Sequence, residues 1–152
     1  MLFHERWILL LATGLGIGKL PRAPGTFGSL LGLVLVWVVS GWPGSLLATF
    51  LLAFCAMAVW VAHKAEHILG VQDPGCIVID EIAGILIAGA GLPFTAPIAA
   101  AVFILFRLLD VLKPFPVGWL DQHLKGGIGI VMDDVAAGIL ANLVIHVGCW
   151  IL

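Results

Sequence analysis

Long apolar runs separated by short polar segments make up most of this chain. No charged side chain occurs between Ala23 and Ala62, and the interruption at 41–44, Gly-Trp-Pro-Gly, is typical of a turn. Apolar runs of this length predict hydrophobic helices. They fall in five places, near 27–40, 44–69, 79–92, 97–112 and 131–150.

Two other segments are less regular. Residues 7–18 are apolar but too few to cross a bilayer, which takes about 20 residues, so they predict an interfacial or half-buried helix. Residues 113–129 mix polar and apolar positions, and part of them is expected to form a short surface helix. The pattern predicts an all-α fold, a polytopic membrane helical bundle of about five to six helices, with a short or re-entrant hairpin at 79–112.

The composition is typical of a membrane protein. Hydrophobic residues make up 62% of the 152 residues and charged residues 11%, whereas a soluble domain has about 25% charged residues. The length suits one domain over residues 1–152. A net charge of −2 gives no basic field for nucleic acid, and the three cysteines lack the paired spacing of a disulfide framework or a zinc site.

The charged residues gather at one end of the predicted bundle. If the first two hydrophobic helices form one hairpin and the next two another, the loops at 41–44 and 92–97 lie at the far end and carry no Lys or Arg. All nine carboxylates fall at the charged end as well. The positive-inside rule then predicts that the charged end faces the cytoplasm.

Two similar segments place acidic pairs beside apolar helices. Ile-Asp-Glu-Ile-Ala-Gly at 79–84 resembles Met-Asp-Asp-Val-Ala-Ala-Gly at 132–138, and each pair is expected to start a helix. The helix dipole would explain one carboxylate per helix, but two pairs together with Asp110 would repel one another. A divalent cation held by carboxylate oxygens removes this repulsion, and Mg²⁺ is typical where phosphate is the other ligand.

Two cationic residues flank Asp110. Arg107 and Lys113 lie three residues before and after it, on the same predicted helix face. A salt bridge between Asp110 and Lys113 is the simpler interpretation. In the functional interpretation, Asp110 binds the metal, and Lys113 and Arg107 bind an anion.

The loop at 19–29 supplies a further candidate. Gly25 and Thr26 open a helix close to Lys19, and free amides at a helix start bind phosphate well. Taken alone, this loop is better explained as a capped turn. Together with the acidic pairs it is expected to contribute to phosphate binding.

Side-chain nucleophiles typical of phosphatases are missing from the sequence. No Cys is followed by Arg at the spacing of cysteine phosphatases, and neither an Asp-x-Asp pair nor a Ser-Gly-His stretch occurs. The remaining chemistry is attack on a phosphate by a metal-activated water.

Four segments, in this order, resemble the bacterial phosphatidylglycerophosphatase A family. They are PRAPGTFGS at 21–29, DEIAG at 80–84, FRLLDVLKPFPVGWLD at 106–121 and KGGIGIVMDDVAAG at 125–138. The resemblance covers the chain from Gly14 to about Asn142, with Phe115 where many members have Trp. It implies an all-α, Mg²⁺-dependent enzyme among membrane lipids that hydrolyses phosphatidylglycerophosphate to phosphatidylglycerol and inorganic phosphate, at the cytoplasmic side of the inner membrane.

In the predicted site, the two acidic pairs and Asp110 lie at the same depth, at the cytoplasmic end of the bundle. The expected metal ligands are Glu81, Asp110 and Asp134. The residues expected to position water or act as general base are Asp80 and Asp133. The expected phosphate-binding residues are Lys113, which also serves catalysis, with Arg107, Lys19, Gly25 and Thr26. Asp121 is expected to lie outside the cluster.

Two other functions are compatible with the pattern. One is a phosphatase for another membrane phosphate ester, such as a prenyl or lysolipid phosphate. The other is a small transporter or cation-binding membrane protein, although the far end carries no charge to continue a cation path. Phosphate release from a lipid phosphate in detergent distinguishes an enzyme from a transporter. The oligomeric state and the number of metal ions stay open.

Overall fold

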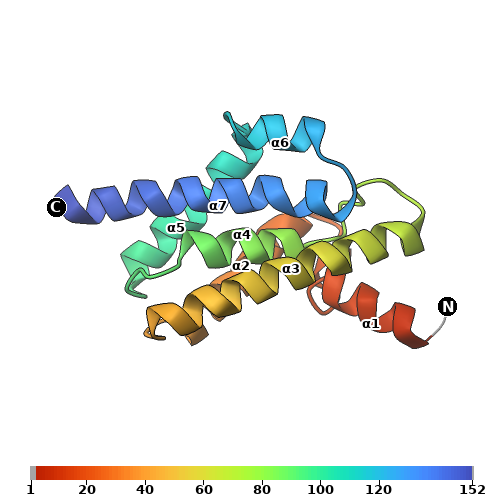
Figure 1. Ribbon diagram of the computed structural model, residues 1–152, viewed down its shortest axis with the longest axis horizontal. Coiled ribbons are helices and arrows are strands. Elements are labelled where there is room, and N and C mark those ends of the chain that lie inside the picture. Colours follow the sequence, from red (N-terminus) through yellow and green to blue (C-terminus); the bar gives the residue numbers. More distant parts are fainter. Residues whose placement is uncertain (1–2, 152) are drawn as a thin grey trace.

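The computed structural model describes residues 3–151, and this part of the chain contains seven α-helices, one 3₁₀ helix and no β-strand (Figure 1). The α-helices are α1 (Phe3–Ala12), α2 (Pro24–Val39), α3 (Gly44–Leu69), α4 (Ile79–Ala88), α5 (Ala96–Leu112), α6 (Val117–His123) and α7 (Gly126–Ile151), and the 3₁₀ helix is Ile17–Lys19. The all-α prediction is confirmed. The seven α-helices of the described residues are one more than the expected five to six: five correspond to the apolar runs, and α1 and α6 correspond to the two shorter segments.

The last helix begins five residues earlier than the apolar pattern predicts. Gly126 and Gly127 disfavour helix, but Gly127 lies so close to α3 that a Cβ there would overlap the carbonyl oxygen of Val59. Packing against α3 therefore stabilises a helical start that propensity alone does not favour. Asp133 and Asp134 consequently lie about two turns inside α7, and not at its start as expected.

The long helix α7 lies at the centre of the bundle and packs against α3, α4, α5 and α6 (Figure 1). At the crossing with α4, a Cβ on Gly138 would overlap the carbonyl oxygen of Gly84, and a Cβ on Gly84 would lie 2.7 Å from the carbonyl oxygen of Asp134. Small residues permit such close approach of helix backbones. This crossing brings the acidic pair of α4 next to the acidic pair of α7.

Helix α4 ends within the bundle, four residues before the predicted end. The side-chain amide of Asn142, on α7, donates hydrogen bonds to the carbonyl oxygens of Ala88 (3.1 Å) and Ala90 (2.9 Å). These bonds satisfy carbonyl groups that the end of a helix leaves free. The 10 residues of α4 are about half the number that a membrane crossing needs, so α4 fits the short hairpin predicted at 79–112.

Within residues 3–151, two helices are long and apolar enough to cross a membrane: α3 and α7, with 26 residues each. In the apolar window of α3 only 17% of the residues are buried inside the bundle, and large apolar side chains such as Leu52 and Trp60 are exposed on it. Apolar surface of this extent is typical of a surface that contacts a membrane or another protein. These features favour association with a membrane.

Candidate active site

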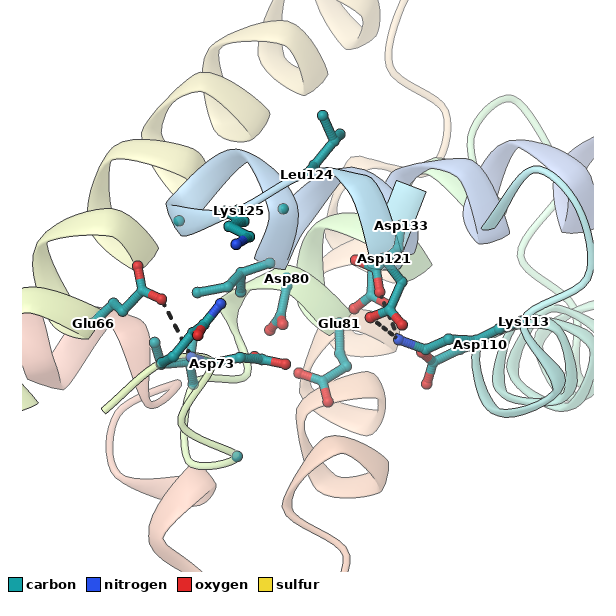
Figure 2. Close-up of a pocket in the computed structure, with 17 residues that line it drawn as sticks. Glu66, Asp73, Asp80, Glu81, Asp110, Lys113, Asp121, Leu124, Lys125 and Asp133 are labelled. Carbon is teal, nitrogen blue, oxygen red and sulfur yellow. Dashed lines mark hydrogen bonds and ion pairs between the residues drawn. The ribbon is translucent and has the colours of Figure 1, made fainter. Parts of the chain in front are cut away.

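Nearly all carboxylates of the chain line one cavity. Of the nine Asp and Glu residues, all except Glu5 line it, together with Lys113 and Lys125 (Figure 2). The eight carboxylates are those of Glu66, Asp73, Asp80, Glu81, Asp110, Asp121, Asp133 and Asp134. The cavity volume is about 490 Å³, within the range usual for small-molecule sites. Eight carboxylates facing two lysines repel one another unless cations or protons compensate them.

Three of these carboxylates form a compact group, which we call the acid cluster: Asp80 and Glu81 from the first turn of α4, and Asp134 from α7. One oxygen from each lies within 4.8 Å of the other two. Asp80 Oδ1 and Glu81 Oε2 are buried and have no hydrogen-bond partner in the described part of the chain. Buried polar atoms without partners are costly, and carboxylate oxygens are the ligands that hard divalent cations prefer. The acid cluster therefore fits a divalent cation.

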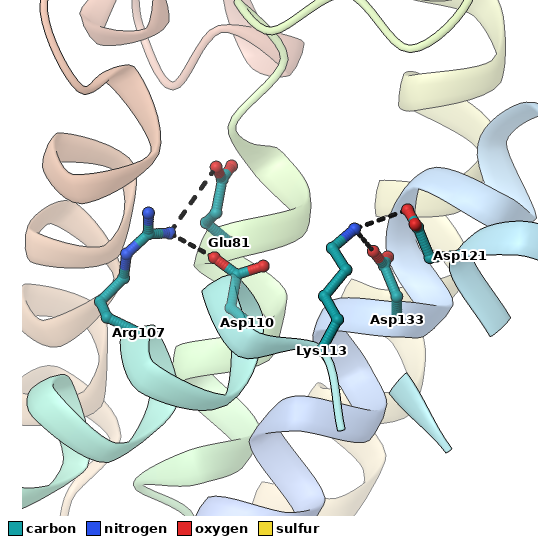
Figure 3. A network of polar contacts seen from close by, with 6 residues as sticks. All are labelled: Glu81, Arg107, Asp110, Lys113, Asp121 and Asp133. Atoms are coloured by element: carbon teal, nitrogen blue, oxygen red, sulfur yellow. Dashed lines mark hydrogen bonds and ion pairs between the residues drawn. The ribbon is translucent and has the colours of Figure 1, made fainter. Parts of the chain in front are cut away.

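Asp110 lies in the last turn of α5 and also lines the cavity. Arg107 donates a hydrogen bond from Nη1 to Asp110 Oδ2 at 2.7 Å, and the same nitrogen lies 4.0 Å from Glu81 Oε1 (Figure 3). Arg107 is not among the residues that line the cavity. Its guanidinium therefore links the carboxylates of Asp110 and Glu81 from outside the cavity lining. The expected contact of Arg107 with phosphate stays a prediction.

Lys113 directly follows α5 and contacts two other helices. Its Nζ donates to Asp121 Oδ1 at 2.5 Å and to Asp133 Oδ2 at 2.9 Å (Figure 3). The simpler interpretation, a salt bridge to Asp110, is wrong for the described residues. Lys113 has φ +46°, so the helix ends before it, and the three-residue spacing no longer places both side chains on one helix face.

Asp121 is not part of the acid cluster, as the sequence predicts, but it lines the same cavity. It belongs to the short helix α6, which packs along α7 and brings its carboxylate to Lys113. This contact depends on the path of the chain from α5 to α7, which the apolar pattern does not specify.

Lys113 stays cationic at physiological pH. Burial lowers the pKa of its ammonium, but the hydrogen bonds and charges of Asp121 and Asp133 outweigh burial and hold this pKa above its ordinary value. An ammonium has three N–H donors, and the two carboxylates use two of them. The third is available to an anion in the cavity.

The start of α2 makes room for the acid cluster. Helix α2 begins at Pro24, which is favourable at a first helical position. A Cβ on the next residue, Gly25, would overlap Glu81 Oε1. Gly25 thus gives space to the Glu81 carboxylate. The expected phosphate contacts of Lys19, Gly25 and Thr26 stay predictions, since none of these residues lines the cavity.

Four polar residues of the cavity were not expected from the sequence: Glu66, Gln72, Asp73 and Lys125. The Asp73 amide donates to Glu66 Oε1 at 3.3 Å. Burial raises the pKa of the Asp73 carboxyl; Lys113 opposes this, and nearby carboxylates add to it. These residues lie in polar segments at the predicted cytoplasmic end, so their general position could be predicted, but their convergence on one cavity could not.

Comparison with known proteins identifies a family for this chain. A family model described as Phosphatidylglycerophosphatase A matches residues 10–148. The chain is 36% identical over 138 residues to Phosphatidylglycerophosphatase A of Escherichia coli (strain K12), a match that covers 90% of this chain and 80% of the relative. It is 39% identical over 140 residues to the protein of the same name from Haemophilus influenzae, covering 91% and 86%.

A third relative carries a different name. The chain is 36% identical over 155 residues to a Bacteroides thetaiotaomicron protein named "Putative phosphatidylinositol-3-phosphatase", and the match covers 95% of this chain and 94% of the relative. No solved structure matches at a significant level. The family model covers both acidic pairs and every residue that lines the cavity, so the chain belongs to the phosphatidylglycerophosphatase A family of phosphatases.

Proposed function

We propose that this protein is a Mg²⁺-dependent membrane phosphatase that hydrolyses phosphatidylglycerophosphate to phosphatidylglycerol and inorganic phosphate. The observation that carries the proposal is the gathering of eight carboxylates and two lysines around one cavity. Such a cavity repels a phosphate dianion, so phosphate binding there requires divalent cations. Membership of a phosphatase family favours this chemistry over cation transport.

The acid cluster is the proposed metal site. Asp80, Glu81 and Asp134 would hold the ion, and Asp110, kept in place by Arg107, would complete the ligand set. Bound there, Mg²⁺ would supply electrophilic activation of the phosphate monoester and of water. Asp80, which the sequence favoured as a base, is proposed as a ligand because it shares the cluster with Glu81 and Asp134.

Asp133 is the proposed general base. Its Oδ2 accepts a hydrogen bond from Lys113, while its Oδ1 is buried without a hydrogen-bond partner in the described chain. The free oxygen is available for a proton from the attacking water. Lys113 keeps the carboxylate oriented, and its remaining N–H would stabilise negative charge that develops on the phosphate.

The substrate is a lipid with two phosphate groups. In phosphatidylglycerophosphate, a phosphodiester joins the diacylglycerol to a head group that ends in a phosphate monoester, and a phosphatidylinositol 3-phosphate has the same arrangement. The names of two relatives support the glycerol head group, and the name of the third supports the inositol head group as the alternative.

The proposed location is the inner membrane, with the active site facing the cytoplasm. The cavity lies at the polar ends of the candidate spans α3 and α7, and it is lined there by Glu66 and Lys125. The loops at 41–44 and 92–97 carry no Lys or Arg, so the positive-inside rule favours this orientation.

Phosphate release by the purified protein in detergent micelles tests the proposal. We expect Mg²⁺-dependent release, with a higher kcat/KM for phosphatidylglycerophosphate than for phosphatidylinositol 3-phosphate or phosphatidate. A higher kcat/KM for phosphatidylinositol 3-phosphate would make that lipid the proposed substrate instead. No release from any of the three lipids would contradict the phosphatase proposal.

A further inference from the structure

We infer that Lys125 binds the terminal phosphate of the substrate, on the side of the acid cluster that faces away from the bilayer. This inference rests on the proposed function and adds a phosphate-binding residue to it. The ligand is a phosphate dianion, carried by the lipid head group before the reaction and free in solution as inorganic phosphate afterwards.

The distribution of charge in the cavity distinguishes Lys125 from Lys113. Two carboxylates contact the ammonium of Lys113, at 2.5 Å and 2.9 Å. In the described part of the chain, no carboxylate forms a salt bridge with Lys125, although eight carboxylates line the same cavity. Lys125 is therefore the cavity lysine whose charge no carboxylate of the described chain offsets within salt-bridge distance.

The position of Lys125 suits the outer end of a lipid head group. Figure 2 shows Lys113 and Lys125 on opposite sides of Asp80 and Glu81. Lys125 directly precedes α7, and at about 1.5 Å per residue Asp133 lies about 12 Å further along the helix axis. In the proposed binding mode the acyl chains would stay beside the apolar part of the bundle, so a phosphate that reaches the acid cluster from there would present its outer oxygens to Lys125.

The start of α7 fixes Lys125 at the cavity. Gly126, directly after it, has φ +64°, a conformation that favours glycine. A Cβ on Gly127 would overlap the carbonyl oxygen of Val59 on α3. The backbone beside Lys125 is thereby held against α3, and the lysine side chain extends from a defined point at the cavity.

Steady-state kinetics of Lys125→Gln with phosphatidylglycerophosphate, and with inorganic phosphate as inhibitor, test the inference. We expect the KM for the lipid and the Ki for phosphate to rise together, each by about tenfold, as for the loss of one charge-assisted hydrogen bond. The value of kcat should stay within about twofold of wild type, because uniform binding is lost. Lys125→Arg should keep both constants close to those of wild type.

Lys64→Gln is the matched control, because Lys64 is exposed near the polar end of α3 and does not line the cavity. It should change neither constant. An unchanged Ki in a folded Lys125→Gln protein would overturn the inference, even if KM rose, since Lys125 would then not contact the terminal phosphate. If the wild-type protein releases no phosphate from the lipid, the proposed function fails, and binding of inorganic phosphate to wild type and Lys125→Gln by calorimetry still tests Lys125.

Discussion

Glu81 lies next to three parts of the site: the acid cluster, Arg107 and the start of α2. It belongs to the acid cluster, and its Oε1 lies 4.0 Å from Arg107 Nη1. Its carboxylate occupies space that a side chain at position 25 would fill, because residue 25 is glycine. Replacing its carboxylate by an amide removes one negative charge and hardly any volume. A protein with this single replacement should therefore lose activity and still fold.

Glu81→Gln should lower kcat by about 100-fold or more, since residues that merely support metal ligands already contribute about 10–100-fold. In EDTA its melting temperature should equal or exceed that of wild type, because one of the repelling carboxylates is gone. Glu5→Gln, the same change outside the cavity, should keep full activity. Equal turnover of Glu81→Gln and Glu5→Gln would exclude Glu81 from the site.

Gly25→Ala tests whether the start of α2 shapes the acid cluster. The added Cβ would overlap Glu81 Oε1, so the carboxylate has to move, and we expect a loss of activity of about tenfold or more. Gly44→Ala is the control, because Gly44 begins α3 and a Cβ there meets no atom within 4 Å. Phosphate release at saturating Mg²⁺ measures both variants, and equal rates would contradict this role of Gly25.

The individual residues of the site were predictable to different degrees. The pairs at 80–81 and 133–134, and Asp110, were predictable because ionisable groups are rare in apolar chains without a function. That Asp121 and Asp73 line the cavity was not predicted, because each reaches the cavity from a segment whose path is set by packing. The partners of Lys113 likewise depend on where α5 ends.

At the scale of helices, the crossing of α4 and α7 holds the two acidic pairs together. The apolar runs predict that both helices exist, and in each helix the sequence places small residues directly after the acidic pair. Neither predicts that α7 starts at Gly126, because that start is stabilised by contact with α3. The helix boundaries therefore depend on tertiary packing, while the helices themselves follow from the sequence pattern.

Gly138→Val should open this crossing. The new side chain would overlap the carbonyl oxygen of Gly84, and overpacking of this kind lowers the free energy of unfolding by about 1–3 kcal/mol. Activity should fall as well, because Asp134 moves away from Asp80. Gly148→Val is the matched control in the same helix, since a Cβ there meets no atom within 4 Å. Thermal unfolding in detergent should show a clearly lower melting temperature for Gly138→Val alone.

At the scale of the whole molecule, the arrangement of charge predicts a topology. Single cysteines placed at Ser45 and Gln122, both exposed, should react with membrane-impermeant reagents from opposite sides of the membrane, with Gln122 on the cytoplasmic side. The background for this measurement is a variant without the three native cysteines, which are free thiols. Labelling of both positions from the same side would contradict the proposed orientation.

The central claim is that the acid cluster works by binding a divalent cation. The most direct measurement is Mg²⁺ binding by calorimetry after treatment with EDTA, with phosphate release followed in the same preparation. We predict saturable binding, activity that returns in proportion to the bound metal, and a melting temperature that rises with Mg²⁺ in wild type but not in Glu81→Gln. Full phosphate release in excess EDTA, with no metal bound, would contradict the account.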